Sequence, residues 1–329
     1  MALDVKVTIS LLKAIGSLNW GYPLILSKSE SAIAYAECES LDEVVTAGFA
    51  ATTDTYKAAE IMFAQKNPPA KIAVCGLATV DATNLATLTG KGWRHLVTVG
   101  EDITQSVVAT YVAGTTDKMY FTGVSATADI ATKVNSESDR VVVVVHSTNA
   151  DLAAAAVAGE VAGNTVGSIT YKNLVIKGID AENLSETAIT AIHTAHAITL
   201  LEKAGDVVTS EGFVMSGEYA DIIDCKDYII SQLTYKTQKL LNNTGKIPYD
   251  DKGIGLLENI AVDVMKDAYS KGMIAEDENG EPIYTVSYAL RSEQDEGDIE
   301  KRKYIGGRFA FTLAGAIHEA SITGEISVI

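Results

Sequence analysis

The stretch that decides the fold is Arg140-Val141-Val142-Val143-Val144-Val145-His146. A strand of consecutive valines has no polar face, so both of its faces must be covered by other parts of the protein. β-Branched residues also favour strands over helices. The stretch therefore predicts a strand of a sheet that is covered on both faces.

Similar apolar runs precede it at 72–77, 95–99 and 118–123, separated by segments of helical length. Alternation of apolar strands with helices is typical of a mostly parallel sheet covered on both faces, so we predict an α/β layer domain. The small residues of 153–162 predict a helix packed closely on this sheet. A second helix is predicted over 185–204.

Beyond Gly205 the pattern changes. Apolar residues at helical spacing predict two helices, and later apolar stretches predict two strands, with a turn at Asn279-Gly280 before the first strand. These predicted elements are helices over 221–241 and 253–269, strands over 283–288 and 304–313, and a solvated charged loop over 292–303. We therefore divide the chain into an N-terminal arm (1–20), an α/β domain (21–204) and a C-terminal α+β domain (205–329) that ends in a strand (320–329).

Both ends of the chain alternate apolar or small residues with polar ones. The apolar or small positions are Leu3, Val5, Val7, Ile9 and Leu11 near the start and Ile322, Gly324, Ile326 and Val328 near the end. A period of two indicates a β-strand with one buried face. With no partner strand next to it in the sequence, each end must join a sheet of its own or of a neighbouring subunit. A strand passed from each subunit to the next builds rings or open helical arrays.

The bulk composition excludes several classes of protein. Forty-three acidic and 26 basic residues give the 329-residue chain a net charge of −17, which repels nucleic acid and anionic membranes. The apolar runs are shorter than the roughly 18–20 residues of a membrane span, and the first residues lack the features of a signal peptide. Three widely separated cysteines fit reduced thiols. We expect synthesis inside a cell without a signal peptide, no membrane insertion and no nucleic-acid partner.

Candidate metal and cofactor sites are weak. No GxGxxG or GxxxxGK[ST] motif is present, so a phosphate-binding loop has no support. His193 and His196 lie three apart on a predicted helix, but no further ligands complete a metal site. Asp250-Asp251 and the acidic run 276–278 lack the periodicity of a calcium loop. We expect neither a metal nor a cofactor.

His146 is the best isolated candidate for catalysis, because functional groups of α/β enzymes often follow sheet strands. No Ser or Cys nucleophile motif accompanies it. His318, beside the terminal strand, is expected to pack or to contact a strand. We therefore predict no catalytic residue and favour an assembly function over an enzyme.

Four stretches, taken in order, carry a family resemblance. They are Tyr56-Lys57-Ala58-Ala59 with Phe63-Ala64-Gln65; Gly212-Phe213-Val214-Met215-Ser216-Gly217-Glu218-Tyr219; Gly245-Lys246-Ile247-Pro248-Tyr249-Asp250-Asp251-Lys252-Gly253-Ile254-Gly255; and Phe311-Thr312-Leu313-Ala314-Gly315-Ala316-Ile317-His318-Glu319. In these stretches the chain resembles the contractile tail sheath proteins of myophages and of phage-tail-like (R-type) bacteriocins, especially forms from Gram-positive hosts. The resemblance runs over nearly the whole chain and is strongest after residue 205.

The resemblance implies a structural subunit of a virion tail or a released bacteriocin particle. Such subunits stack as six-fold rings in a helical tube around an inner tail tube, with the C-terminal domain innermost and the α/β domain outside. Terminal arms, here the strand patterns at both ends, join sheets of neighbouring subunits. Rearrangement of the interfaces contracts the sheath and drives the tube through a target envelope. The implied partners are further copies of the chain, the inner tail tube protein, and baseplate and tail terminator proteins.

The basic side chains near the C-terminal strand are candidates for contact with an acidic tube, or for a solvated loop: Lys301, Arg302, Lys303 and Arg308. Two other functions remain open. One is an α/β enzyme or ligand-binding domain with a pocket near His146. The other is a non-contractile tube or surface-layer protein.

Overall fold

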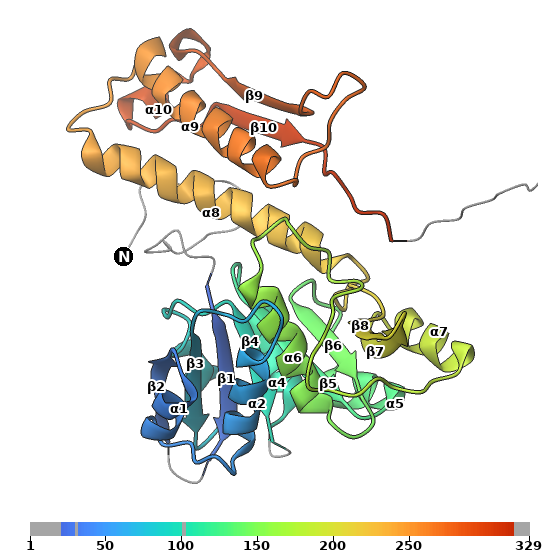
Figure 1. The fold of residues 1–329 in the computed structure, drawn as a ribbon. Coiled ribbons are helices and arrows are strands. Elements are labelled where there is room, and N and C mark those ends of the chain that lie inside the picture. The colour runs from blue at the N-terminus through green and yellow to red at the C-terminus, as the bar shows by residue number, and fades with distance from the viewer. Residues whose placement is uncertain (1–20, 30–31, 101–102, 319–329) are drawn as a thin grey trace, which may run out of the picture.

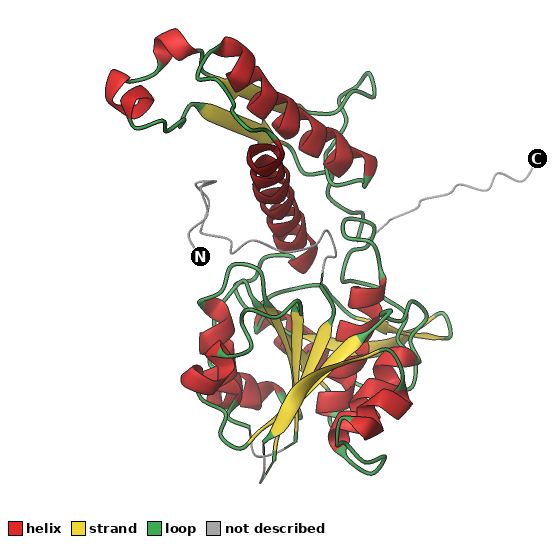
Figure 2. Cartoon of the chain, turned by 90° about the vertical axis from the view of Figure 1, so that its left-hand side faces the viewer, coloured by secondary structure: helices red, strands yellow, loops and turns green. Residues whose placement is uncertain are grey.

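A computed structural model describes residues 21–29, 32–100 and 103–318. It consists of a sheet-based body from which a long helix leads to a smaller unit of helices and strands (Figure 1). Viewed from the side, the strands of the large sheet lie in one layer with helices on both faces (Figure 2). The predicted α/β layer architecture is confirmed.

The large sheet has the strand order β2-β3-β1-β4-β5-β6-β7-β8. Its six inner strands run parallel and its two edge strands are antiparallel to their neighbours. The parallel strands are β1 (Pro23–Lys28), β3 (Ile72–Leu77), β4 (His95–Val99), β5 (Met119–Val124), β6 (Val141–Val145) and β7 (Ile198–Lys203), and the edge strands are β2 (Ile33–Cys38) and β8 (Asp206–Thr209).

The five valines of β6 alternate between two apolar cores, one on each face of the sheet. Val142 and Val144 belong to the core under α1, α2 and α6, and the other three valines to the core under α3, α4, η1 and α7. The helices are α1 (Leu41–Thr46), α2 (Asp54–Phe63), α3 (Ala82–Ala86), α4 (Gln105–Ala113), α5 (Thr127–Asp129), η1 (Ile130–Val134), α6 (Ala150–Gly163) and α7 (Glu186–Thr194). The valine run is covered on both faces, as its lack of a polar face requires.

Helix α6 is buried over most of its length, which confirms the prediction of a small-residue helix packed on the sheet. A Cβ atom at Gly159 would lie 2.8 Å from the Cα of Met62 in α2, and one at Gly163 would overlap the carbonyl of Asn67. The two glycines therefore permit a close approach that no other residue allows.

The helix predicted over 185–204 is confirmed for its first part and wrong for its second. α7 ends at Thr194, His196 adopts a left-handed backbone (φ 54°), and the following residues form β7 beside β6. Ile198 and Leu200 are completely buried there. Pairing with a central strand outweighs local helix propensity at these β-branched and apolar positions.

The remaining elements form a second unit around a third apolar core. They are α8 (Ala220–Asn243), α9 (Asp251–Ser270), η2 (Arg291–Glu293), α10 (Glu296–Glu300) and a separate two-stranded sheet of β9 (Tyr284–Tyr288) and β10 (Gly307–Phe311). The two predicted helices and two predicted strands are confirmed, while the charged run 292–303 includes the end of η2 and all of α10 as well as loop. The domain division at residue 204 stays a prediction; the last strand of the large sheet ends at Thr209.

Candidate assembly interface

The nine predicted arm residues lie outside the described part of the chain. They are Leu3, Val5, Val7, Ile9, Leu11, Ile322, Gly324, Ile326 and Val328. The described residues contain the edges of two sheets to which such strands could be added.

The two-stranded β9–β10 sheet has one sheltered face and one exposed face. The sheltered face packs on the third core through Tyr284, Val286, Tyr288, Phe309 and Phe311. The exposed face carries Thr285, Ser287, Arg308 and Ala310. An added strand with one apolar face would continue this arrangement, because alternate residues of a strand face opposite sides of a sheet.

Both outer edges of this sheet turn peptide groups outward. The N–H of Thr312 donates to the carbonyl of Ile283 (3.0 Å) and that of Ala289 to the carbonyl of Gly306 (3.1 Å), which fixes the inward-facing pairs of the ladder. In an antiparallel pair, such positions alternate with positions whose N–H and C=O point away from the partner strand. The outward-facing residues are Tyr284, Val286 and Tyr288 on β9 and Gly307, Phe309 and Phe311 on β10. Within the described residues, no third strand pairs with β9 or β10 along their length; the segment 274–276 forms single antiparallel bridges just beyond their ends, Ile274 with Leu313 and Glu276 with Pro282. The N–H of Tyr284 donates locally to the carbonyl of Pro282 (3.1 Å).

The edges of the large sheet are protected in comparison. The outer side of β8 is covered by the segment 173–176, since Asn173 N–H donates to Thr209 O (3.0 Å) and Ile176 N–H to Val207 O (2.8 Å). At the other edge, β2 has a register shift between Ile33 and Ala36. Covered and bulged edges resist strand addition. The β9–β10 sheet is therefore the better acceptor.

The four predicted basic residues are all exposed in this same unit. Lys301, Arg302 and Lys303 follow α10, and Arg308 projects from the exposed face of β10. The hydroxyl of Tyr249 donates to the carbonyl of Lys303 (3.0 Å) and so fixes the backbone of this turn. In the described part of the chain, none of the four side chains forms an ion pair. They thus present positive charge to the outside of a strongly acidic protein.

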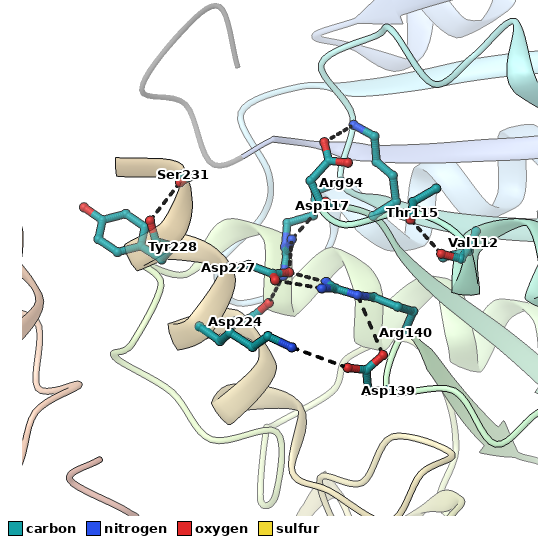
Figure 3. A network of polar contacts seen from close by, with 12 residues as sticks. Arg94, Val112, Thr115, Asp117, Asp139, Arg140, Asp224, Asp227, Tyr228 and Ser231 are labelled. Atoms are coloured by element: carbon teal, nitrogen blue, oxygen red, sulfur yellow. Dashed lines mark hydrogen bonds and ion pairs between the residues drawn. The ribbon is translucent and has the colours of Figure 1, made fainter. Parts of the chain in front are cut away.

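A buried ionic network, not predicted from the sequence, joins the second unit to the large sheet (Figure 3). Asp227 of α8 accepts hydrogen bonds from Arg94 (3.0 Å) and from two nitrogens of Arg140, one of them at 2.8 Å. Asp224 also accepts from Arg94, and from the hydroxyl of Tyr171 (2.6 Å). The side chains of Arg94, Arg140 and Asp227 are at most 6% exposed. The first turns of α8 are therefore held to the sheet by charges that water barely reaches.

Burial and neighbouring charges shift the pKa values of three groups in or beside this joint. Burial alone would lower the pKa of Arg94, but the carboxylates of Asp224 and Asp227 raise it above its usual value. Burial, together with the proximity of Asp224, raises the pKa of Tyr171 well above its usual value, so its hydroxyl keeps its proton. His95 lies next to the joint, and burial lowers its pKa so far that its ring stays neutral.

The basic half of this network has a signal in the sequence. Arg94, Lys118 and Arg140 immediately precede β4, β5 and β6, so a basic residue stands before each of three adjacent strands. Their side chains are buried, which is unusual for cations that lack partners. The pattern is visible in the sequence, but the acidic partners on α8 are not.

His146 has both ring nitrogens engaged in the fold. Its Nε2 lies 3.0 Å from the carbonyl of Asp180, and its Nδ1 lies 3.1 Å from the N–H of Asn149. Nδ1 also lies 3.3 Å from Oε1 of Glu182, an oxygen that accepts from the N–H and the hydroxyl of Ser147. The side chain is 4% exposed. His146 therefore stabilises the turn after β6, and the geometry gives no support to a catalytic role.

The other singled-out histidines form a cluster with aromatic residues rather than a metal site. The rings of His193 and His196 each lie 6.3 Å from that of Phe213, and His193 Nε2 lies 2.9 Å from Ser210 Oγ. Because α7 ends at Thr194, the expectation that both histidines lie on one helix is wrong. The described residues contain no group of three or more His, Cys, Asp or Glu side chains arranged to hold a metal.

The two acidic runs stabilise local structure. Asp250 caps α9 by accepting from the N–H of Gly253 (2.8 Å), and Asp251 accepts from the N–H of Arg291 (2.9 Å). Asp277 accepts from the N–H groups of Asn279 and Glu281 and so closes the turn before β9. Within the described ranges, no helix is both long enough and apolar enough to cross a membrane.

Comparison with known proteins relates this fold to contractile machines. No family model and no curated protein matches the sequence. Among solved structures, the sheath of an extracellular contractile injection system (PVC) in its contracted state matches with a TM-score of 0.72 and 12% identity over 100% of this chain and 99% of the other. The contracted helical sheath of the anti-feeding prophage matches with a TM-score of 0.70 and 12% identity, over 98% and 99%.

A sheath tail protein from Listeria innocua matches with a TM-score of 0.57 and 11% identity, over 82% of this chain and 88% of the other. At these identities the similarity establishes the fold. The chain has the fold of contractile sheath proteins over its whole length.

Proposed function

We propose that this chain is the structural subunit of a contractile tail sheath. It polymerises as a helical tube of six-fold rings around an inner tail tube, and contraction of the sheath drives that tube through a target envelope. The observation that carries the proposal is the β9–β10 sheet, which has two unpaired edges in a chain with two amphipathic ends. The whole-length similarity to sheath folds supports it independently.

In this assembly the strand patterns at residues 3–11 and 322–328 pair with β9–β10 edges of neighbouring subunits. Two arms and two edges per subunit allow every edge to be filled. Each main-chain hydrogen bond contributes about 1 kcal/mol net, and burial of the apolar face of the arm adds to this. Subunits tied in this way can move between two packings as rigid bodies without a nucleotide, if the extended array is a kinetically trapped state.

Substitution of Val286 by proline tests the edge. Val286→Pro removes an outward N–H of β9 while keeping a small apolar side chain, and edge positions with outward N–H groups tolerate proline. We expect Val286→Pro to remain folded but to form no tubes in negative-stain images, at concentrations where Val286→Ala forms them. Tubes of equal yield from both variants would contradict strand addition at β9.

We assign Lys301, Arg302, Lys303 and Arg308 to the contact with the inner tube, since they are exposed, unpaired by carboxylates within the described residues, and gathered in the innermost domain of the proposed assembly. Changing the three consecutive residues to Glu is expected to weaken binding to the inner tube about tenfold at low salt and much less at high salt, because exposed charges are screened.

A control with the same net charge change uses three exposed lysines of the α/β domain. Lys28→Glu, Lys66→Glu and Lys177→Glu together should leave tube binding unchanged, as measured by co-sedimentation of sheath with tube. An equal loss in both triple variants would show that only net charge matters and would remove these residues from the interface.

The proposal extends to the particle. We assign the chain to the form of sheath found with Gram-positive hosts on the order of the four sequence stretches, and expect baseplate and tail terminator proteins as further partners. Synthesis in the cytoplasm, release as part of a virion tail or bacteriocin, and the absence of enzymatic activity belong to the same proposal. Recovery of the chain in purified particles together with those proteins tests this part.

A further inference from the structure

The segment between β10 and the predicted C-terminal arm is fixed at both of its ends and exposed in between. At its start, Ala314 N–H donates to the carbonyl of Met273 (3.0 Å). Gly315 then turns the chain with φ 63°, and the next residues are exposed, with Ile317 at 89%. The chain leaves β10 here and runs back along the molecule toward the body that contains the large sheet (Figure 1).

At its far end, His318 returns to sheltered surroundings. Its ring meets that of Tyr219 edge-on at 4.8 Å, and its Nε2 lies 2.9 Å from Thr170 Oγ1. Its Nδ1 lies 4.0 Å from Oε2 of Glu211, and the side chain is 15% exposed. None of these three partners belongs to β9, β10 or α9. His318 therefore links the end of the small sheet to loops beside the large one.

The carboxylate of Glu211 strengthens this interpretation. Its Oε1 accepts from Lys172, but its Oε2 is buried and, within the described residues, has no hydrogen-bond partner. A buried carboxylate oxygen without a donor is costly. Nδ1 of His318 faces this oxygen at 4.0 Å, so keeping the ring in place keeps a nitrogen that is able to donate beside the oxygen.

We propose that His318 is a clip that holds the root of the C-terminal arm against its own subunit and so fixes where the arm leaves. This inference rests on the proposed function. Holding His318 in place fixes the point from which residues 319–329 must reach a neighbour, which lowers the conformational cost of strand addition. Residues 315–317 lie between the two fixed points, Ala314 and His318. If His318 were released, these three residues could extend as well, and the arm would reach farther.

The first test measures the clip in the isolated subunit. A nitroxide label at Ala316→Cys reacts selectively, because Cys38, Cys75 and Cys225 are buried. We expect His318→Ala to make this label clearly more mobile in the electron paramagnetic resonance spectrum and to change the melting temperature by no more than about 2 °C. Thr170→Val, which keeps the ring contact, should have an intermediate effect. Identical spectra in all three backgrounds would overturn the proposal.

The second test measures assembly of the unlabelled chains by sedimentation. His318→Ala should raise the critical concentration for tube formation about tenfold, while Ala316→Ser, at an exposed neighbouring position, should leave it unchanged. An equal critical concentration for His318→Ala and the native chain would overturn the proposal. Absence of tubes from the native chain would count against the proposed function instead, and the spectra would then decide whether His318 holds the segment.

Discussion

Deletion of residues 320–329 is expected to yield a folded, soluble subunit that forms no tubes. All three apolar cores of the described chain are built from residues before Ala314, so the deletion removes none of their side chains. It removes the segment that we propose to add as a strand to a neighbour's β9–β10 edge. A helical array held by strand exchange loses several main-chain hydrogen bonds and an apolar contact at every subunit.

Electron microscopy of the truncated chain measures tube formation, and thermal unfolding measures whether the subunit is still folded. Full-length variants then test whether tube formation needs the apolar face of the arm and not only an arm of the same length. Ile322→Ser, Ile326→Ser and Val328→Ser together should abolish tubes, whereas Thr323→Ala and Ser327→Ala on the opposite face should not. Tubes of normal length from the truncated chain would refute the role of the arm.

Replacement of Asp227 by alanine is expected to destabilise the protein by about 3–5 kcal/mol, the usual cost of leaving buried charges without their partner. Arg94 would keep Asp224 and the carbonyl of Asp117, but Arg140 would keep only Asp139, at 3.8 Å. Because Asp227 lies on α8, the loss should also loosen the attachment of the second unit to the large sheet. Urea unfolding followed by circular dichroism measures the change in free energy.

Asp139→Ala is the control for this prediction. Asp139 also faces Arg140, but its side chain is 40% exposed, and ion pairs of that kind contribute at most about 1 kcal/mol. A large loss for Asp227→Ala and a small one for Asp139→Ala is the expected result. Equal losses of unfolding free energy in the two variants would mean that the buried ion pairs stabilise the protein no more than the exposed one.

Several parts of the fold could be predicted because they depend on local pattern. The valine run of β6 has no polar face, and the apolar spacing of α8 and α9 fits one side of a helix, so each element follows from its own residues. The extent of α7 could not be predicted in this way. The segment after Thr194 has mixed propensity, and only its position beside β6 makes it a strand.

The same distinction holds for the candidate interface. Period-two alternation is local and predicts the arms, which lie outside the described residues and stay a prediction. The strands β9 and β10 are predicted as apolar runs near a turn. The ionic joint was missed because Asp227 is 133 residues from Arg94 and 87 from Arg140, and a single sequence does not indicate which distant charges meet. For His318 the sequence predicts only packing or a strand contact, since its three partners come from two connections, one before α7 and one between β8 and α8, that are far from it in the chain.

In the sheath that we propose, strands from other subunits complete the β9–β10 sheet. A helical reconstruction of tubes from the full-length chain by cryo-electron microscopy would show these strands. We expect β9 and β10 each to acquire an outer strand, and these strands to trace to residues 3–11 and 322–328 of neighbouring subunits. Tubes in which β9 and β10 remain a two-stranded sheet, with subunits touching only through other surfaces, would contradict it.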